Sequence, residues 1–254
     1  MSRSILEICV DSTASALAAR AGGADRLELC ADLSIGGTTP SLALVRQVKA
    51  ETGLPVRVLL RPRAGDFCYD RWELAQMEEL AAALVGAGAD GIVTGVLNPE
   101  GDLDLPAMER ICQAARGAAQ GRPVALALHR AFDVCRDAGA CLEAACSLGL
   151  DTILTSGQAA DAYTGRALLA RMQQQAAGRI EILAGSGVNA ANIPLLARET
   201  GIRSFHLSGK CTIPSQMIFR RPGVPMGLPG FAEFELWQTD PEAVRRARQA
   251  LDSL

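Results

Sequence analysis

The stretch AGGADRLELC at residues 21–30 contains the pattern that decides the fold. A glycine-rich turn leads directly into a short, mostly apolar run at 26–30, which is typical of a buried strand. The same punctuation returns as AGAD at 87–90 and as LGLD at 148–151, each followed by another short apolar run. Glycine at such a point can end a helix and let the chain turn into a sheet. The stretch therefore predicts a helix-to-strand junction that recurs along the chain.

Eight runs of this kind are predicted to be strands, and they alternate with longer helical segments. The segment RWELAQMEELAAALVGAG at 71–88, for example, has apolar residues at helical spacing. The strand starts recur at roughly the length of one βα unit. Nearly all the runs are apolar, as expected for a parallel sheet that is buried on both faces. The predicted strands are Ser4–Val10, Arg26–Cys30, Val56–Arg61, Gly91–Val96, Val124–His129, Thr152–Thr155, Ile180–Ala184 and Ser204–Leu207.

The number of units favours a closed barrel. The chain has 254 residues, close to the roughly 250 that are typical of a complete (β/α)8 barrel. No linker or low-complexity block divides the chain, so residues 1–254 are predicted to form a single-domain TIM barrel. The segment 220–239, which contains RPGVPMGLPGF, is expected to be irregular before the last helix. A doubly wound sheet of eight strands is the alternative.

Composition and charge exclude several classes of partner. The net charge of −3 gives no reason to expect nucleic acid or an anionic membrane. The N-terminal MSRSILEICVDS lacks the continuous apolar region of a secretory signal, and the apolar runs elsewhere are broken well before the roughly 20 residues of a membrane span. The 8 cysteines include no Cys-x-x-Cys pair, so a zinc ribbon and a thioredoxin motif are excluded. A cytoplasmic location is expected.

Polar side chains gather where the predicted strands end, which is where barrels place their working groups. Residues two apart on a strand share a face, so Glu7 points the same way as Cys9, and Glu28 the same way as Cys30. One interpretation is a catalytic pocket; the alternative is a salt-bridge network between the carboxylates and an arginine in the barrel mouth. The candidate catalytic residues are Glu7, Glu28, Arg61 and His129.

The loops after the last two strands resemble an anion-binding cradle. Glycine-rich turns beside helix N-termini expose backbone N–H groups at this place in many barrels. The candidate ligand-binding residues are Gly185, Ser186, Gly187 and Ser208, and Lys210 lies nearby. An ordinary turn with a solvated lysine is the alternative. The loop 61–69, RPRAGDFCY, is long and aromatic and is interpreted as a lid or a subunit contact.

Several of these motifs together resemble the CutC family. They are LEIC, GGADRLELCADLSIGGTTPS, RPRAGDFCY, DGIVTGVLNPEGDLD, HRAFD, LTSG, AGSGVNAANI and FHLS, in this order over nearly the whole chain. The chain departs from the family pattern at Leu128, Leu207 and Gly209. The resemblance implies a TIM barrel, a cytoplasmic location, a homodimer or larger homo-oligomer, and a role in copper homeostasis. It also implies that Cys9 and Cys30 are the pair that binds copper(I).

Two functions follow from these residues. In the first, the thiolates of Cys9 and Cys30 bind Cu(I), for which thiolates are preferred ligands. In the second, the barrel is an enzyme of lyase, isomerase or hydrolase type that acts on a small anionic metabolite. There His129 or a carboxylate is the acid or base, with His129 cycling its proton near neutral pH, and Arg61 holds the anion. The chain has no dinucleotide-binding fingerprint.

Overall fold

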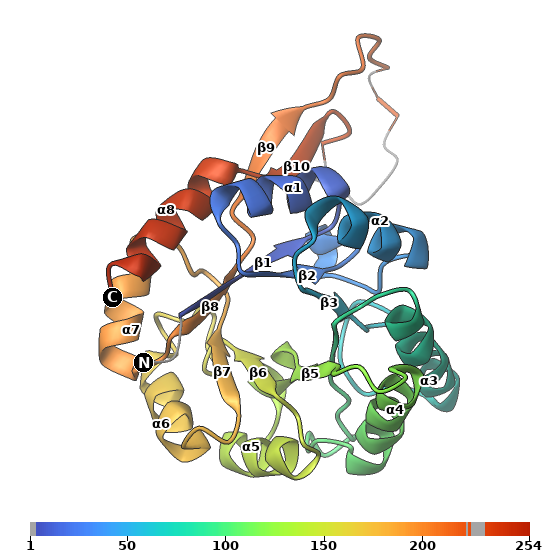
Figure 1. Ribbon diagram of the computed structural model, residues 1–254, viewed down its shortest axis with the longest axis vertical. Helices are drawn as coiled ribbons and strands as arrows, with labels where there is room; N and C mark the ends of the chain where they lie inside the picture. The colour runs from blue at the N-terminus through green and yellow to red at the C-terminus, as the bar shows by residue number, and fades with distance from the viewer. Residues whose placement is uncertain (1–3, 222, 225–231) are drawn as a thin grey trace.

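Eight parallel strands close into a barrel in a computed structural model that describes residues 4–221, 223–224 and 232–254. The strands are hydrogen-bonded in chain order, and β8 pairs with β1 to complete the ring (Figure 1). The predicted TIM barrel is confirmed, and the doubly wound sheet is excluded because its edges would stay open. The strands are β1 (Ile5–Val10), β2 (Arg26–Leu29), β3 (Val56–Leu59), β4 (Gly91–Thr94), β5 (Ala125–Leu128), β6 (Thr152–Thr155), β7 (Glu181–Ala184) and β8 (Ser204–Leu207).

The helices form an outer ring around these strands (Figure 1). The junction at 21–30 behaves as predicted: Gly23 adopts a left-handed φ of 95° and ends the first helix, with its N–H bonded to the carbonyl of Ala19. The helices are α1 (Thr13–Gly22), α2 (Leu42–Thr52), α3 (Arg71–Gly86), α4 (Leu105–Ala118), α5 (Ala138–Ser147), α6 (Arg166–Ala176), α7 (Ile193–Thr200) and α8 (Pro241–Asp252), with short 3-10 turns η1 (Leu33–Ile35) and η2 (Arg130–Val134).

Some strands end earlier than predicted. β3 ends at Leu59 and β5 at Leu128, so Arg61 and His129 lie just beyond the ladder. The backbone N–H of Arg61 donates to Thr39 Oγ1 at 2.8 Å, and the ring of His129 accepts from the N–H of Ala131 at 3.1 Å. These side-chain contacts, together with the bond from the His129 N–H to the carbonyl of Thr94 at 3.0 Å, fix the two residues at the mouth.

Side chains on the two faces of the strands form separate layers. Leu6, Ile8 and Val10 of β1 are fully buried in the core between strands and helices. The inward face instead carries a small apolar layer made of Cys30, Leu59, Val93 and Ala127. On the N-terminal side of this layer the barrel is polar, because the inward residues there are Glu7, Arg26, Arg57, Thr152, Glu181 and Ser204.

A two-stranded hairpin projects beyond the ring of helices (Figure 1). It consists of β9 (Lys210–Pro214) and β10 (Glu235–Thr239), which pair antiparallel. The expectation of an irregular segment over 220–239 is therefore wrong for 235–239, because these residues find a partner strand in β9 that the local pattern does not reveal. Residues 222 and 225–231, with most of the Pro-rich run, lie outside the described residues.

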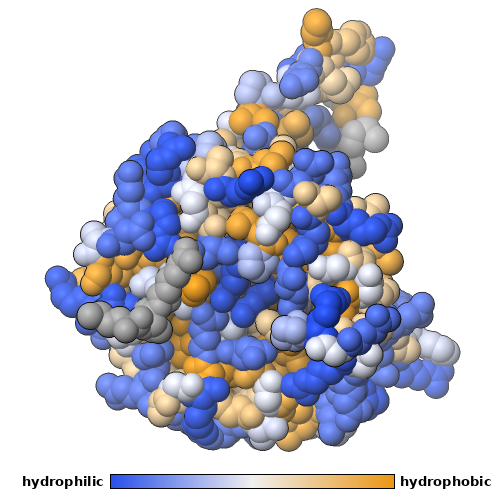
Figure 2. Space-filling view, viewed as in Figure 1, coloured by the Kyte–Doolittle hydropathy of each residue, from blue (hydrophilic) through white to orange (hydrophobic). Residues whose placement is uncertain are grey.

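The hairpin carries exposed apolar side chains on its outer part, which Figure 2 shows as a hydrophobic patch on the projecting arm. Ile218 is 97% exposed, and Met217 and Phe219 are also largely exposed. Within the described residues, no helix is long and apolar enough to cross a membrane.

Candidate functional site

A cavity of about 160 Å³ lies at the mouth of the barrel. It brings together all of the residues predicted as catalytic or metal-binding except Glu7, which lies next to it in the polar layer. Strand register explains the arrangement: Cys9 of β1 lies opposite Glu28 of β2, and Glu7 lies opposite His206 of β8. The predicted residues in its wall are Cys9, Glu28, Cys30, Arg61 and His129.

His206 is the site residue that the sequence predictions missed. Ligand atoms of Cys9, Glu28 and His206 all lie within 4.8 Å of one another, which is close enough to hold one metal ion. The only sequence signal was that His206 is one of two histidines, both near strand ends. Its partner Glu7 lies 199 residues away, so only the closure of the barrel brings the two together.

Glu7 and His206 form a charged pair. Nδ1 of His206 lies 2.8 Å from Oε1 of Glu7, and Arg26 donates to the other carboxylate oxygen. Burial alone would raise the pKa of Glu7, but Arg26, His206 and Arg57 outweigh it and hold that pKa well below its usual range. Burial would lower the pKa of His206, but Cys9, Glu28 and Glu7 raise it well above the ordinary value. Glu7 is therefore ionised, and His206 is protonated.

Glu28 and Cys30 form a second, less charged pair. The Sγ of Cys30 donates to Oε2 of Glu28 at 3.6 Å, and the same oxygen lies 3.6 Å from Nε2 of His206. Burial and the charge of Glu7 raise the pKa of Glu28 despite the opposing effect of His206. Burial and Glu28 raise the pKa of the Cys30 thiol well above its usual value. Cys30 is thus a protonated thiol at rest, and Glu28 can carry a proton.

One sequence interpretation placed an arginine, Arg61, in a salt-bridge network with the carboxylates. The structure shows that Arg61 does not pair with them. Nη1 of Arg61 donates to the carbonyl of Gly37 at 3.0 Å, and Nη2 to that of Gly65 at 2.9 Å. Because β3 ends before Arg61, its guanidinium bridges the loops after β2 and β3. Arg26 and Arg57, which lie deeper in the barrel, approach Glu7 instead.

His129 does not fit the predicted role of a proton carrier near neutral pH. Burial and the nearby charge of Arg61 lower its pKa to about 3. The ring packs against Phe67, with centroids 4.7 Å apart, and Arg61 lies over the same phenyl ring. Nδ1 accepts from Ala131, so the neutral ring carries its proton on Nε2, a buried atom without a partner among the described residues. His129 is a fixed hydrogen-bond donor.

A larger cavity of about 770 Å³ adjoins the site on the side of β7 and β8. Of the residues predicted to bind a ligand, Ser186, Gly187 and Ser208 line it and Gly185 does not. Gly185 is buried against β6, where an added Cβ would lie 2.5 Å from Leu154. Two arginines and a lysine line this cavity beside His206, and no aspartate or glutamate does; they are Arg130, Arg246 and Lys210.

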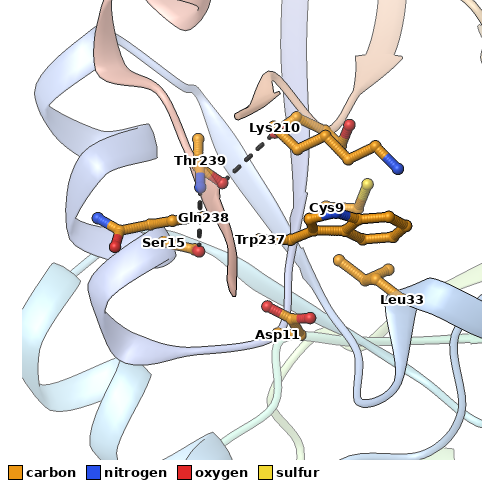
Figure 3. A pocket seen from close by; sticks show the side chains of 9 residues that line it. Cys9, Asp11, Ser15, Leu33, Lys210, Trp237, Gln238 and Thr239 are labelled. Carbon is orange, nitrogen blue, oxygen red and sulfur yellow. Dashed lines mark hydrogen bonds between the residues drawn. The ribbon is translucent and has the colours of Figure 1, made fainter. Parts of the chain in front are cut away.

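The hairpin closes a third cavity beside Cys9. Trp237 of β10 and Lys210 of β9 form one wall of this space of about 140 Å³, and Leu33 lies in the other (Figure 3). Nζ of Lys210 lies 3.4 Å from the centre of the indole ring. The N–H of Thr239 donates to Ser15 Oγ on α1 and anchors the hairpin (Figure 3). Cys9 lines all three cavities and is the thiol through which they meet.

A family model, two relatives and a solved structure all relate the chain to the same family. A family model described as "CutC family" matches residues 4–211. A Bacteroides fragilis family protein CutC is 41% identical over 257 residues, covering 100% of this chain and 98% of the relative. A Vibrio parahaemolyticus family protein CutC is 42% identical, covering 97% and 98%. A Streptococcus agalactiae structure named for copper homeostasis protein CutC has a TM-score of 0.74 at 31% identity, covering 81% of this chain and 98% of that one. A 2,3-dimethylmalate lyase at 18% identity and a TM-score of 0.56 shares the fold.

Proposed function

The chain belongs to the CutC family, and from that premise we propose that it binds Cu(I) at the mouth of its barrel and serves in copper homeostasis. The observation that carries the proposal is the clustering of ligand atoms from Cys9, Glu28 and His206 within 4.8 Å. Cys30 adjoins this cluster through its contact with Glu28. Cys9 and Cys30 are the proposed thiolate ligands, and Nε2 of His206 is the proposed third; Cys30 and His206 would each release a proton when the metal binds.

The donor set and its surroundings suit this ion. Thiolate and imidazole are ligands that Cu(I) accepts readily. Glu7 binds Nδ1 of His206 and so leaves Nε2 on the side of Cys9 and Glu28. A carboxylate behind a histidine is the usual outer support of a metal ligand, because it fixes the ring and its tautomer. The eight free cysteines fit a reducing compartment, so we propose a cytoplasmic location as well.

Competition with a Cu(I) chelator tests the proposal. We expect Cys9→Ala/Cys30→Ala to lose at least about 100-fold in Cu(I) affinity. Loss of a residue that only supports a ligand already lowers metal affinity roughly 10–100-fold, and loss of the two thiolate ligands themselves should lower it at least as much. The matched control is Cys68→Ala/Cys211→Ala, which removes two exposed thiols that do not belong to the cluster. Equal affinity of the Cys9/Cys30 double variant and the wild type would contradict the proposal.

A second function is favoured by a separate observation, the cationic cavity that shares Cys9, Arg130 and His206 with the cavity in which Glu28 lies. An enzyme acting on a small anionic metabolite would use such a cavity to hold the anion. Glu28, whose pKa is raised by burial, then serves as general acid or base, and His206 supplies positive charge. The reaction class is proton transfer, as in a lyase, isomerase or hydrolase. Thermal-shift screening of small anions tests it, because a ligand at 100 times its Kd stabilises by about 2.7 kcal/mol.

A homo-oligomer is the proposed assembly. The chain that leaves β9 exposes three consecutive apolar side chains, Met217, Ile218 and Phe219, and exposed apolar clusters often mark a contact with another protein. The loop 61–69, which the sequence predicts as a lid or subunit contact, is a poorer candidate at Phe67–Tyr69. Tyr69 is buried, and Phe67 packs inward on His129.

A further inference from the structure

The two cavities at the barrel mouth share Cys9, Arg130 and His206 in their linings. We propose that they form one site for a small phosphate monoester with a carbonyl oxygen a few bonds from the phosphorus. The phosphate lies in the outer cavity and the carbonyl reaches the inner one. This inference deepens the enzymatic function proposed above and does not depend on copper.

The charge of the outer cavity selects an anion. Its lining holds Arg130, Lys210 and Arg246 but no carboxylate, in a chain whose net charge is −3. Arg130 is held in place by Asp133 at 2.7 Å and by Ser156 at 3.1 Å. Two guanidinium groups and a lysine around one cavity match a doubly charged phosphate better than a single carboxylate, because guanidinium groups bind phosphate oxygens in pairs.

Backbone donors line the same cavity. The loop after β7 turns through two left-handed residues, Ser186 at φ 71° and Gly187 at φ 68°. In the described part of the chain, the N–H groups of Gly187, Val188 and Ala190 have no hydrogen-bond acceptor. Those of Asn189 and Ala191 are satisfied by asparagine side chains. The free N–H groups add donors for phosphate oxygens without adding a counter-charge.

The inner cavity offers a donor that lacks an acceptor. Nε2 of His129 is buried, carries the proton of a neutral ring, and has no partner among the described residues. Nε of Arg61, in the wall of the same cavity, is also without one. A buried donor left unpaired costs free energy, which a ligand oxygen recovers. A neutral imidazole donor beside a positive guanidinium favours an uncharged oxygen that gains negative charge during reaction, as a carbonyl does.

Size limits the ligand. The inner cavity of about 160 Å³ has room for several non-hydrogen atoms beyond the phosphate, whereas a water takes about 30 Å³ in the liquid. Glu28 and His206 lie in the same lining as His129. A carbonyl bound to His129 therefore places its neighbouring carbon among groups that can hold a proton.

Calorimetric titration of copper-free protein tests the inner half of the site. The probes are dihydroxyacetone phosphate, isopropyl phosphate and inorganic phosphate; the second has three carbons and the phosphate but no carbonyl. We expect the ketone to bind at least tenfold more tightly than isopropyl phosphate. His129→Asn keeps an acceptor for the Ala131 N–H and removes the Nε2 donor, so the tenfold preference should vanish while isopropyl phosphate binds as before.

The outer half is tested by two neighbouring arginines of α8. Both arginines have a carboxylate partner, Asp240 for Arg246 at 3.8 Å and Glu242 for Arg245, but only Arg246 lines the cavity. Arg246→Gln should weaken binding of both esters at least fivefold, and Arg245→Gln should leave it unchanged. Equal binding of ketone and isopropyl phosphate by the wild type, or equal effects of the two arginine changes, overturns the inference. Tight binding of the ketone without turnover of any ester would contradict the enzymatic function and leave the binding site established.

Discussion

At the scale of single residues, the barrel mouth contains two histidines held in opposite states by their neighbours. Glu7 and Glu28 face His206 and keep it protonated, whereas Arg61 and burial keep His129 neutral. The neutral state of His129 depends on pH in a way that can be measured. An unfolded histidine has a pKa near 6.5, and the folded value is about 3.

The first prediction is that His129 lowers stability in mild acid. Between these two pKa values the unfolded chain binds a proton that the folded chain refuses, so stability falls as pH falls through this window. From pH 6.5 to 5 this amounts to about 1–2 kcal/mol. His129→Asn, which does not titrate, should lose that much less over the same interval. Urea unfolding at several pH values measures the difference, and parallel curves for the two proteins would contradict the prediction.

The second prediction concerns the buried ion pair beneath the site. Arg26 donates to Glu7 and to Glu181, at 2.8 Å in the latter case, with only 11% of its side chain exposed. Arg26→Met fills similar space but leaves Glu7 without its principal partner, which should destabilise the protein by about 3–5 kcal/mol. Arg179→Met is the control, because the Arg179–Glu143 pair is exposed and worth at most about 1 kcal/mol. A similar urea midpoint for both variants would show that Glu7 needs no countercharge.

The residues of the site were predictable to the extent that strand periodicity decides them. Glu7 with Cys9, and Glu28 with Cys30, share inward faces because side chains alternate along a strand. Which residues touch across the barrel was not predictable. The contact of Glu7 with His206 depends on barrel closure, and the role of Arg61 depends on where β3 ends.

At the scale of elements, the β9–β10 hairpin adds to the barrel a wall that the plain fold lacks. Trp237 and Leu236 are adjacent in β10, and only Trp237 lines the cavity beside Cys9. The hairpin was not predicted, because the Pro- and Gly-rich run between its strands favours irregular structure and the pairing joins residues more than twenty positions apart, such as Trp237 with Thr212. The eight barrel strands were predictable because each is a local apolar run.

The third prediction is that Trp237 shields Cys9. Trp237→Ala should open the cavity of about 140 Å³ to solvent and speed alkylation of Cys9 by iodoacetamide severalfold. Leu236→Ala is the matched control on the neighbouring position, since Leu236 does not line this cavity. Mass spectrometry of the Cys9 peptide separates this thiol from the exposed Cys68 and Cys211. Unchanged alkylation of Cys9 in Trp237→Ala would show that the barrel alone protects it.

At the scale of the whole molecule, the barrel is closed and surrounded by helices, so its sheet offers no open edge to a second copy. The hairpin projects beyond the ring of helices (Figure 1). Its apolar residues Met217, Ile218 and Phe219 are 59%, 97% and 65% exposed. A stable interface buries roughly 800 Å² on each partner. Because the hairpin projects from the barrel, most of the hairpin's own surface can contact a second copy of the chain.

The last prediction is that this arm joins copies of the chain. Light scattering at micromolar concentration should find a dimer or larger assembly. Ile218→Glu/Phe219→Glu should shift it to monomer without changing the urea midpoint of the barrel, because a charge in an apolar contact is costly unless it is paired. Val134→Glu is the control, since Val134 is 62% exposed on a different part of the surface, in η2. A wild type that is monomeric throughout the micromolar range, or a Val134→Glu that dissociates as readily, would contradict the prediction. The first result would leave the exposed patch without a partner in this chain, and the second would place the interface over the barrel mouth.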